Sequence, residues 1–189
     1  MARTKPAEER RADLLAAAQW LFVTKGASAT IVEDITKRAG VSQGLFYHYF
    51  RSKEDLVFAL QEQFSTQFAG RIAHAAAQQS DWGDKLDACV RESFACYREM
   101  HELHAVLFRP ASENREEPAH SALAQALQEL LEAGIEAGAY TITDPAATAV
   151  LLYATMHTFD PTFFGAAPPT DQQLIAAAQE LFRRSTGLS

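Results

Sequence analysis

The sequence has little that marks a secreted or membrane-embedded protein. Only Cys89 and Cys96 are cysteines among 189 residues, which excludes a disulfide scaffold and favours a reducing, cytoplasmic setting. The first ten residues contain no apolar stretch, so we expect no secretory signal. The uncharged stretch 146–156 is too short to cross a bilayer, and we therefore expect no membrane partner.

Residues that favour β-strands are also scarce. Val and Ile together number 13, whereas Ala, the strongest helix former, numbers 35. We therefore predict an all-α protein of about nine helices. The periodicity of apolar residues places them at about 7–24, 30–39, 42–49, 52–78, 80–100, 101–108, 119–137, 144–159 and 170–184, with a break near His101 and a loop over 110–118.

Capping residues give the helix starts. Thr30 and Glu33 match a capping box, and Ser42 caps the short helix that follows. Asp144 before Pro145, and Thr170, are typical starts of later helices. Gly40 ends the helix that Thr30 opens, so the turn 40–42 joins two short helices in a helix-turn-helix pattern.

The net charge of −7 is unevenly distributed along the chain. Residues 1–60 carry nine Lys or Arg and seven Asp or Glu, a net charge of +2. Residues 61–189 carry eight and seventeen, a net charge of −9. Because local charge decides contact with a polyanion, only the N-terminal part is expected to approach nucleic acid.

The segment 30–57 combines this helix-turn-helix with side chains suited to DNA. Gln pairs bidentately with adenine, and Gly allows close approach of the backbone. Tyr, His and Lys are phosphate-type donors. A small three-helix bundle with an ordinary polar surface explains the same pattern, and chemistry alone leaves both interpretations open. The residues that suggest DNA binding are Gln43, Gly44, Tyr47, His48 and Lys53.

A longer set of residues follows the order and spacing of one family's signature. The residues are Leu14, Ala17, Phe22, Gly26, Thr30, Val32, Ile35, Ala39, Gly40, Val41, Ser42, Gly44, Phe46, Tyr47, Phe50, Ser52, Lys53, Glu54, Asp55 and Leu56. Residues 11–57 therefore resemble the DNA-binding domain of the tetracycline-repressor (TetR) family of bacterial transcription regulators. The rest of the chain is compatible with that family through its length, helix count and acidic all-α character.

Three positions depart from the family's pattern. Thr36 stands where the family usually has Ala, and Ile31 replaces a frequent Thr, which removes one hydroxyl near the expected phosphate side. Leu45 is bulkier than the usual residue of the recognition helix. It either packs inward, which we favour, or touches a thymine methyl group.

The resemblance implies a helix-turn-helix DNA-binding domain over 1–51 and a ligand-binding and dimerisation domain over 52–189. Residues 42–49 would form the recognition helix, with Gln43 and Gly44 at base edges. The residues implied to hold phosphates are Thr30, Ser42, Tyr47, His48 and Lys53. Arg3, Lys5, Arg10 and Arg11 form either a basic arm toward DNA or a solvated terminus.

The resemblance also implies a homodimer built by the last two helices, with an intramolecular core as the alternative. The candidate interface residues are Ala147, Val150, Leu151, Ala154, Leu174, Ala178, Leu181 and Phe182. Large soft side chains suggest a pocket for a small apolar or aromatic effector, or else a filled core. The candidate pocket residues are Phe64, Phe68, Phe94, Tyr97, Met100, Phe108, Tyr153 and His157.

Two smaller features favour plain structural roles. His101 and His104 lie three residues apart, but no third ligand is close in sequence, so we expect a surface pair and no metal. Apolar neighbours around Cys89 and Cys96 favour small core residues over a redox sensor. We expect no cofactor beyond an effector of unknown identity.

The sequence thus predicts a ligand-responsive, homodimeric repressor. It would bind a palindromic double-stranded DNA operator and be released by its effector. The alternatives are a small helical ligand-binding protein or enzyme, or a protein-binding adaptor, in which the helix-turn-helix is structural. An enzyme is disfavoured because no Ser/His/Asp set, Gly-rich phosphate loop or metal cluster is recognisable.

Overall fold

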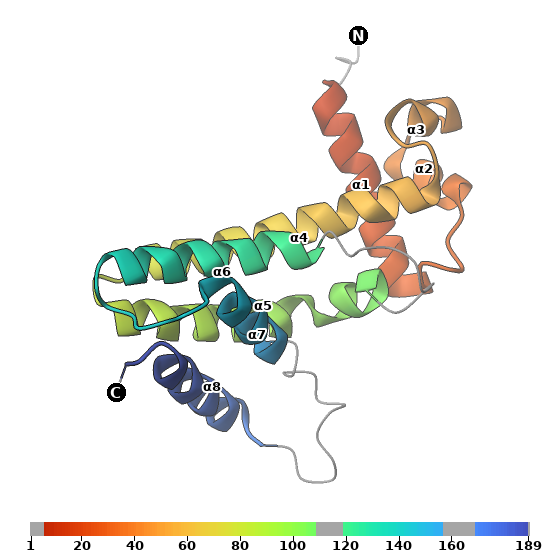
Figure 1. Ribbon diagram of the computed structural model, residues 1–189. Helices are drawn as coiled ribbons and strands as arrows, with labels where there is room; N and C mark the ends of the chain where they lie inside the picture. The colour runs from red at the N-terminus through yellow and green to blue at the C-terminus, as the bar shows by residue number, and fades with distance from the viewer. Residues whose placement is uncertain (1–5, 109–118, 157–168, 189) are drawn as a thin grey trace. The chain divides into compact units, whose positions relative to one another are not determined.

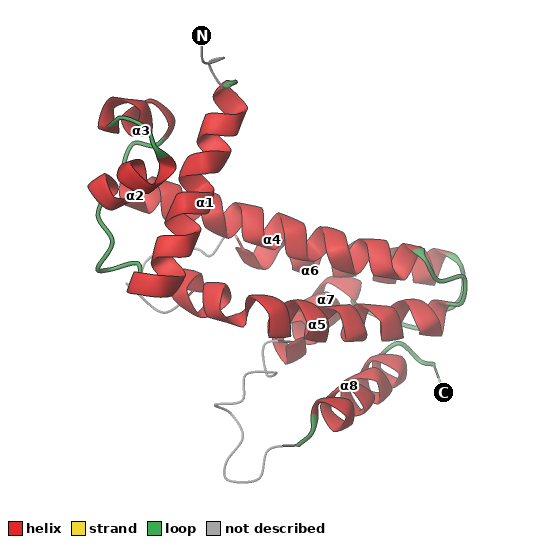
Figure 2. Ribbon diagram, turned by 180° about the vertical axis from the view of Figure 1, so that it is seen from behind, coloured by secondary structure: helices red, strands yellow, loops and turns green. Residues whose placement is uncertain are grey.

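The computed structural model describes residues 6–108, 119–156 and 169–188, and every regular element in these ranges is a helix (Figures 1 and 2). The helices are α1 (Ala7–Lys25), α2 (Val32–Ala39), α3 (Gln43–Tyr49), α4 (Lys53–Ala77), α5 (Trp82–Phe108), α6 (Ala119–Glu136), α7 (Pro145–Met156) and α8 (Asp171–Ser185). The all-α prediction is confirmed.

The described part of the chain has eight helices because one predicted break does not occur. α5 continues through His101 to Phe108. The segment contains no Gly or Pro that would interrupt backbone hydrogen bonds, and Leu103 and Leu107 are buried one turn apart. The predicted loop 110–118 and the end of the helix expected over 144–159 lie outside the described residues.

The chain forms two compact units. The head unit comprises residues 1–63 and 100–115, and the body unit comprises residues 64–99 and 116–189. α4 and α5 each contribute residues to both units. Residues 52–63 therefore group with the helix-turn-helix, whereas the expected division at residue 51 separates them. That functional boundary stays a prediction.

The head unit is built on the apolar face of α1. This face is buried, with Leu14, Ala18 and Phe22 fully inaccessible to solvent. Ile35 of α2 and Phe46 of α3 are likewise fully buried. This burial of apolar surface is the main favourable contribution to folding of so small a unit.

The body unit has its own apolar core, to which α4, α5, α6, α7 and α8 all contribute. Its largest fully buried side chains are Ile72, Leu86, Val90, Leu123, Leu127, Leu131 and Phe182. Ion pairs tie its helices at the edge of this core. Arg71 joins α4 to α5 through Glu92 at 2.6 Å, and Arg183 joins α8 to α5 through Asp87 at 3.0 Å.

Both cysteines lie inside the body unit. Cys89 and Cys96 are 0% and 1% exposed, which confirms the burial expected for them. Burial raises the pKa of each thiol to about 12, so both remain protonated at neutral pH. Because the thiolate is the reactive form, these are structural residues.

Tyr140 closes one end of the body core. Its hydroxyl donates a hydrogen bond to the backbone oxygen of Trp82 at 2.8 Å, and the two rings meet edge to face. Its ring lies directly on Gly134, where an added Cβ would fall 2.0 Å from a ring carbon. The close approach of this ring therefore requires glycine in α6.

We expect Gly134→Ala to lower the free energy of unfolding by about 1–3 kcal/mol, because overpacking outweighs the better helix propensity of alanine. Urea denaturation followed by circular dichroism measures this change. Gly70→Ala in α4 is the matched control. A Cβ there meets no atom within 4 Å, so we expect stabilisation of up to about 1 kcal/mol. Equal stabilisation in both variants would contradict the assigned role of Gly134.

Candidate nucleic-acid interface

The turn between α2 and α3 is closed by backbone hydrogen bonds. Gly40 adopts φ 68° and ψ 33°, a left-handed conformation that favours glycine. The N–H of Val41 donates to the carbonyl oxygen of Thr36 at 3.0 Å, and the N–H of Gly40 donates to that of Lys37 at 3.3 Å. These bonds satisfy carbonyl groups at the end of α2 and fix the direction in which the chain enters α3.

α3 has only seven residues and is held by its cap and its core side chain. The hydroxyl of Ser42 accepts a hydrogen bond from the N–H of Leu45 at 3.2 Å, which confirms the predicted cap. Phe46 is 0% exposed, and its ring lies 5.7 Å from that of Phe50. The orientation of α3 is thus set from inside the head unit.

The opposite side of α3 is exposed. Helical spacing puts Gln43, Gly44, Tyr47 and His48 on one face, and all four are accessible to solvent. Tyr47 is 57% exposed, which is high for a large aromatic residue. The structure therefore brings these four candidate contact residues together on one surface. Their contacts with DNA stay predictions.

Leu45 does not belong to this exposed face. It is half-buried and lines a cleft of about 460 Å³ with Val41 and Ala39 near the turn, and with Arg10 and Asp13 of α1. Its position agrees with the inward-packing alternative.

The start of α2 differs from the prediction. α2 begins after Ile31, whose N–H donates to the carboxylate of Asp34 at 3.2 Å. Thr30 is not the cap, because its buried hydroxyl donates to the carbonyl oxygen of Gly26 at 2.8 Å. An acidic residue also lies three positions after Ile31, so the helix can start one or two residues later than the predicted box requires.

Lys53 also has partners within its own chain. Its ammonium donates to the carbonyl oxygens of Ala27 at 2.9 Å and Thr30 at 3.0 Å. Both acceptors lie in the loop that precedes α2. The side chain is half-buried, unlike those of the exposed lysines of this unit. The phosphate contacts expected for Thr30 and Lys53 stay predictions, but both side chains already hold this loop.

Two contacts that the sequence did not suggest hold α2 against α1. The guanidinium carbon of Arg38 lies 3.4 Å from the centre of the Trp20 ring. At the other end of α2, Lys25 forms an ion pair with Asp34. The Lys25 ammonium and the Ile31 amide both lower the pKa of Asp34.

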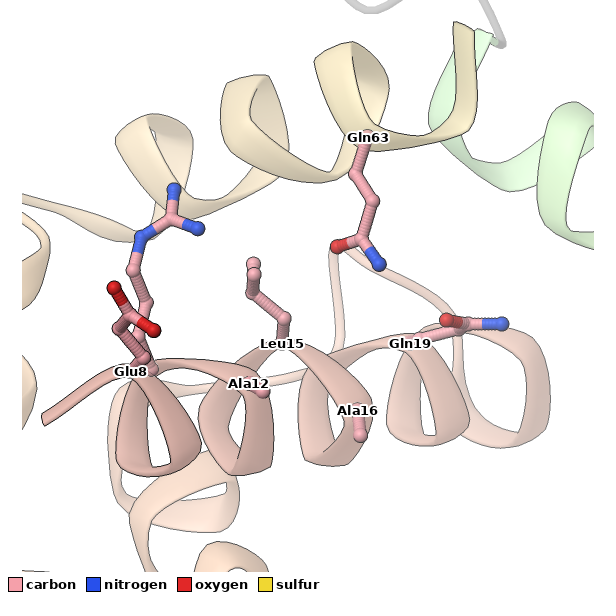
Figure 3. A pocket seen from close by; sticks show the side chains of 7 residues that line it. Glu8, Ala12, Leu15, Ala16, Gln19 and Gln63 are labelled. Atoms are coloured by element: carbon pink, nitrogen blue, oxygen red, sulfur yellow. The ribbon is translucent and has the colours of Figure 1, made fainter. Parts of the chain in front are cut away.

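The expected basic arm lies only partly within the described residues. Arg3 and Lys5 are outside them, whereas Arg10 and Arg11 belong to α1. The guanidinium of Arg11 lies 5.3 Å from the centre of the Phe50 ring. Arg11 also lines an open hollow of about 450 Å³, in which Leu15 of α1 points toward α4 and Gln63 of α4 points back (Figure 3).

The candidate effector residues are distributed over both units. Phe94 and Tyr153 are buried in the body core, Phe68 and Tyr97 pack against it, and the ring of Phe64 lies 6.1 Å from that of Phe68. Met100 and Phe108 belong to the head unit instead, and His157 lies outside the described residues. One shared pocket for all eight stays a prediction.

The candidate dimer residues of α7 form an exposed apolar stripe. Ala147, Val150, Leu151 and Ala154 share one helix face and are all exposed, with Val150 at 56% and Leu151 at 67%. On α8, Leu181 is 49% exposed, and Leu174 and Ala178 are half-buried. The prediction that Phe182 lies in the dimer interface is corrected by its burial. Phe182 is 0% exposed inside its own body unit, so its side chain is core.

The described residues contain no group of three or more His, Cys, Asp or Glu side chains arranged to hold a metal ion. Among the described helices, none combines the length and apolar character needed to span a bilayer.

The geometry of the head unit places the protein in the class of helix-turn-helix proteins. α2 and α3 form the helix-turn-helix, α1 packs against it, and α3 has an exposed polar face. Residues 14–60 match the model of the family described as bacterial regulatory proteins, tetR family. This segment therefore belongs to the TetR family, as the resemblance predicted.

Two curated relatives are described as regulators of opposite sign. The chain is 34% identical over 97 residues to the HTH-type transcriptional repressor KstR2 of Rhodococcus jostii, covering 51% of this chain and 48% of that protein. It is 34% identical over 89 residues to the HTH-type transcriptional activator FasR of Mycolicibacterium smegmatis, covering 47% and 41%. The matches thus span about half or less of each of these two relatives.

The similarity of fold extends over nearly the whole chain. A TetR-family transcriptional regulator from Syntrophomonas wolfei superposes with a TM-score of 0.79, covering 97% of this chain and 98% of that one. The sequence identity is 22%, so this likeness establishes the fold of the chain and not its operator or effector.

Proposed function

We propose that the protein is a transcriptional regulator that reads operator DNA with the exposed face of α3. The observation that carries this proposal is the arrangement around Phe46. That side chain is fully buried, whereas Gln43, Tyr47 and His48 face solvent from the same seven-residue helix. A rigidly seated short helix with a polar outer face fits the major groove of B-DNA.

Each exposed residue has a chemical part in this proposal. Gln43 pairs with an adenine edge through its amide, which makes it the residue that reads sequence. The hydroxyls of Ser42 and Tyr47 and the ring of His48 contact phosphates and set the register of the protein on the duplex.

Gly44 supports the same interface from packing. A Cβ at this position would meet only the Ser42 hydroxyl, at 3.9 Å, and the backbone there is not strained. No described contact of its own chain therefore requires glycine, although glycine weakens a helix by about 0.5–1 kcal/mol relative to alanine. Close approach of DNA to the backbone explains its presence.

We further propose that the regulator is a homodimer joined through α7 and α8. The stripe of Ala147, Val150, Leu151 and Ala154 leaves apolar surface exposed in a single chain, and a second copy would cover it. A two-fold dimer presents two copies of α3 to half-sites about 34 Å apart, which fits a palindromic operator.

The regulator acts as a repressor that a small, largely apolar or aromatic effector releases from DNA in the cytoplasm. The effector favours a form of the dimer whose two α3 helices no longer match successive major grooves. Each tenfold loss of DNA affinity requires about 1.4 kcal/mol of preference for that form. Because curated relatives include an activator as well as a repressor, the sign of regulation needs its own measurement.

Selection of duplexes from a random DNA pool, at near-physiological salt and without effector, tests DNA reading. We expect enrichment of one palindrome. Gln43→Ala should change the preferred base at one position of each half-site, where a bidentate contact is worth about 1–3 kcal/mol. Tyr47→Phe should weaken binding to all duplexes similarly. Gln67→Ala, at an exposed glutamine of the body unit, is the control and should change neither.

Failure to enrich any duplex with the folded protein would count against this proposal. It would favour a helix-turn-helix with a purely structural role in a ligand-binding protein or adaptor. Unchanged selection by both α3 variants would show that the contact residues are wrongly assigned.

Gly44→Ala separates the contribution of this residue to folding from its contribution to binding. We expect the free energy of unfolding to stay the same or to rise by up to about 1 kcal/mol. DNA affinity, measured by fluorescence anisotropy on the selected duplex, should fall at least about tenfold, because the added methyl group intrudes on a close contact worth more than about 1.4 kcal/mol. Gly70→Ala is the matched control and should leave affinity unchanged. Wild-type affinity in Gly44→Ala would exclude close approach at this point.

Leu151→Glu tests the dimer. A carboxylate at the most exposed leucine of the α7 stripe would be desolvated on association, so we expect monomers in sedimentation velocity experiments and weaker binding to the palindrome. Ala133→Glu adds the same charge at an exposed position of α6 outside the stripe and should remain dimeric. A dimer that persists in Leu151→Glu would place the interface elsewhere.

A further inference from the structure

Side chains donate hydrogen bonds to three backbone carbonyl groups of the loop 26–31, between α1 and α2. Gly26 accepts a hydrogen bond from the Thr30 hydroxyl, and the ammonium of Lys53 reaches the carbonyl oxygens of Ala27 and Thr30. The N–H of Ile31 is taken by Asp34. A loop without regular structure is thereby fixed immediately before the first residue of α2.

Lys53 is the only one of these contributors that comes from a distant part of the chain. It is the first residue of α4, 26 positions after Ala27 and 23 after Thr30. An ammonium has three N–H donors, and two of them are used here at 2.9 and 3.0 Å. Charge-assisted hydrogen bonds of this kind are stronger than those between neutral groups.

The end of α4 that carries Lys53 is itself fixed. The N–H of Asp55 donates to the Ser52 hydroxyl at 3.2 Å, and the carboxylate of Asp55 accepts from the N–H of Arg51 at 2.8 Å. Arg51 follows Phe50, which is 2% exposed at the end of α3. This reciprocal capping leaves the first turn of α4 in a single position relative to the end of α3.

These contacts close a circuit. The chain runs from α2 through the turn 40–42 to α3, and from Phe50 into the capped start of α4. Lys53 then returns to the loop that precedes α2. We propose that Lys53 is a positioning residue of the DNA interface, whose bonds to Ala27 and Thr30 fix α3 relative to α2. This inference rests on the proposed binding of DNA by α3.

A phosphate contact and a positioning contact predict different losses. Removing a phosphate contact weakens specific and non-specific duplexes alike, and reduces the slope of log affinity against log salt by about one. Removing a positioning contact leaves the phosphate contacts in place but misaligns the residues at base edges. Only the specific duplex is then bound less tightly, and the salt slope for non-specific DNA stays unchanged.

The test compares Lys53→Met with wild type on the selected palindrome and on a scrambled duplex of equal length. Methionine keeps an unbranched stem but has no donor. We expect specific affinity to fall at least about tenfold, as loss of hydrogen bonds to a charged group predicts, with non-specific affinity and its salt slope retained. A slope reduced by about one, or equal loss on both duplexes, overturns the proposal in favour of a phosphate contact.

Hydrogen exchange without DNA gives an independent measurement. In Lys53→Met the amides of residues 26–32 should exchange faster, while those of the α1 core keep wild-type protection. A general loss of stability would raise exchange in both segments, lower the active fraction and leave the ratio of specific to non-specific affinity unchanged. That result would overturn the proposal.

Lys37→Met is the matched control. It removes the same charge from an exposed lysine of the head unit whose ammonium makes no hydrogen bond or ion pair to any residue that the structure describes. Exchange of 26–32 and the affinity ratio should stay as in wild type. A change of that ratio equal to the change in Lys53→Met would overturn the proposal, because it would assign the effect to net charge.

Lys53→Arg keeps the charge and serves if Lys53→Met does not fold. Its planar guanidinium does not reproduce the compact ammonium between two carbonyl groups. Faster exchange of 26–32 together with a reduced affinity ratio supports the proposal, and a wild-type affinity ratio overturns it. Failure of the proposed function itself is distinguishable, because the wild-type protein would then select no duplex.

Discussion

The arrangement of the head unit depends on one constraint: α3 is too short to stand alone. Isolated helices below about 12–15 residues are marginal in water, and α3 has seven. It exists because Phe46 is buried against the core and because the Ser42 hydroxyl satisfies an amide at its start. Its inner side therefore has one permissible placement. The outer side of α3 is fixed together with the inner side. Burial of Phe46 therefore positions Gln43 and Tyr47, which are themselves exposed. In the proposed function, contact with base edges requires a precisely placed surface, and burial of Phe46 in the core supplies that precision.

Sequence patterns revealed the elements whose causes are local. The Ser42 cap and the Thr170 cap each depend on residues within one turn, and both occur in the structure. The start of α2 was mispredicted because Thr30 and Glu33 match a capping box, whereas the structure starts the helix after Ile31, whose N–H donates to Asp34. The segment thus offers two alternative starts. Partners far along the chain decide between them: Lys25 pairs with Asp34, and Lys53 binds the Thr30 carbonyl. Such contacts leave no periodic trace in a sequence.

The same distinction explains the predictions for the body unit. An apolar side chain on a helix indicates that the position is buried, but it does not indicate which element or chain buries it. Phe182 and Leu181 are neighbours on α8, yet the first is fully buried in its own chain and the second is half exposed. Aromatic residues expected to share a pocket divide between the body unit and the head unit for the same reason. Packing distributes large side chains according to which helices meet, and that information is tertiary. The exposed stripe of α7 is the informative exception, because a helix face that no described residue covers is visible only once the fold is known.

Dimerisation and DNA reading are energetically linked in the proposed function. One seven-residue helix offers few base contacts, each worth about 1–3 kcal/mol, so a single head unit discriminates weakly between sequences. Joining two copies makes the second contact intramolecular, which multiplies affinity without any new base contact, provided the geometry matches both half-sites. The charge distribution supports DNA binding by the N-terminal part of the chain alone. A net charge of −9 over residues 61–189 disfavours contact of that part with DNA, while +2 over residues 1–60 gives only modest non-specific attraction. In the proposed function, a protein with so small a positive charge over this segment depends on two correctly spaced recognition helices, and the apolar stripe of α7 is the surface proposed to hold them together.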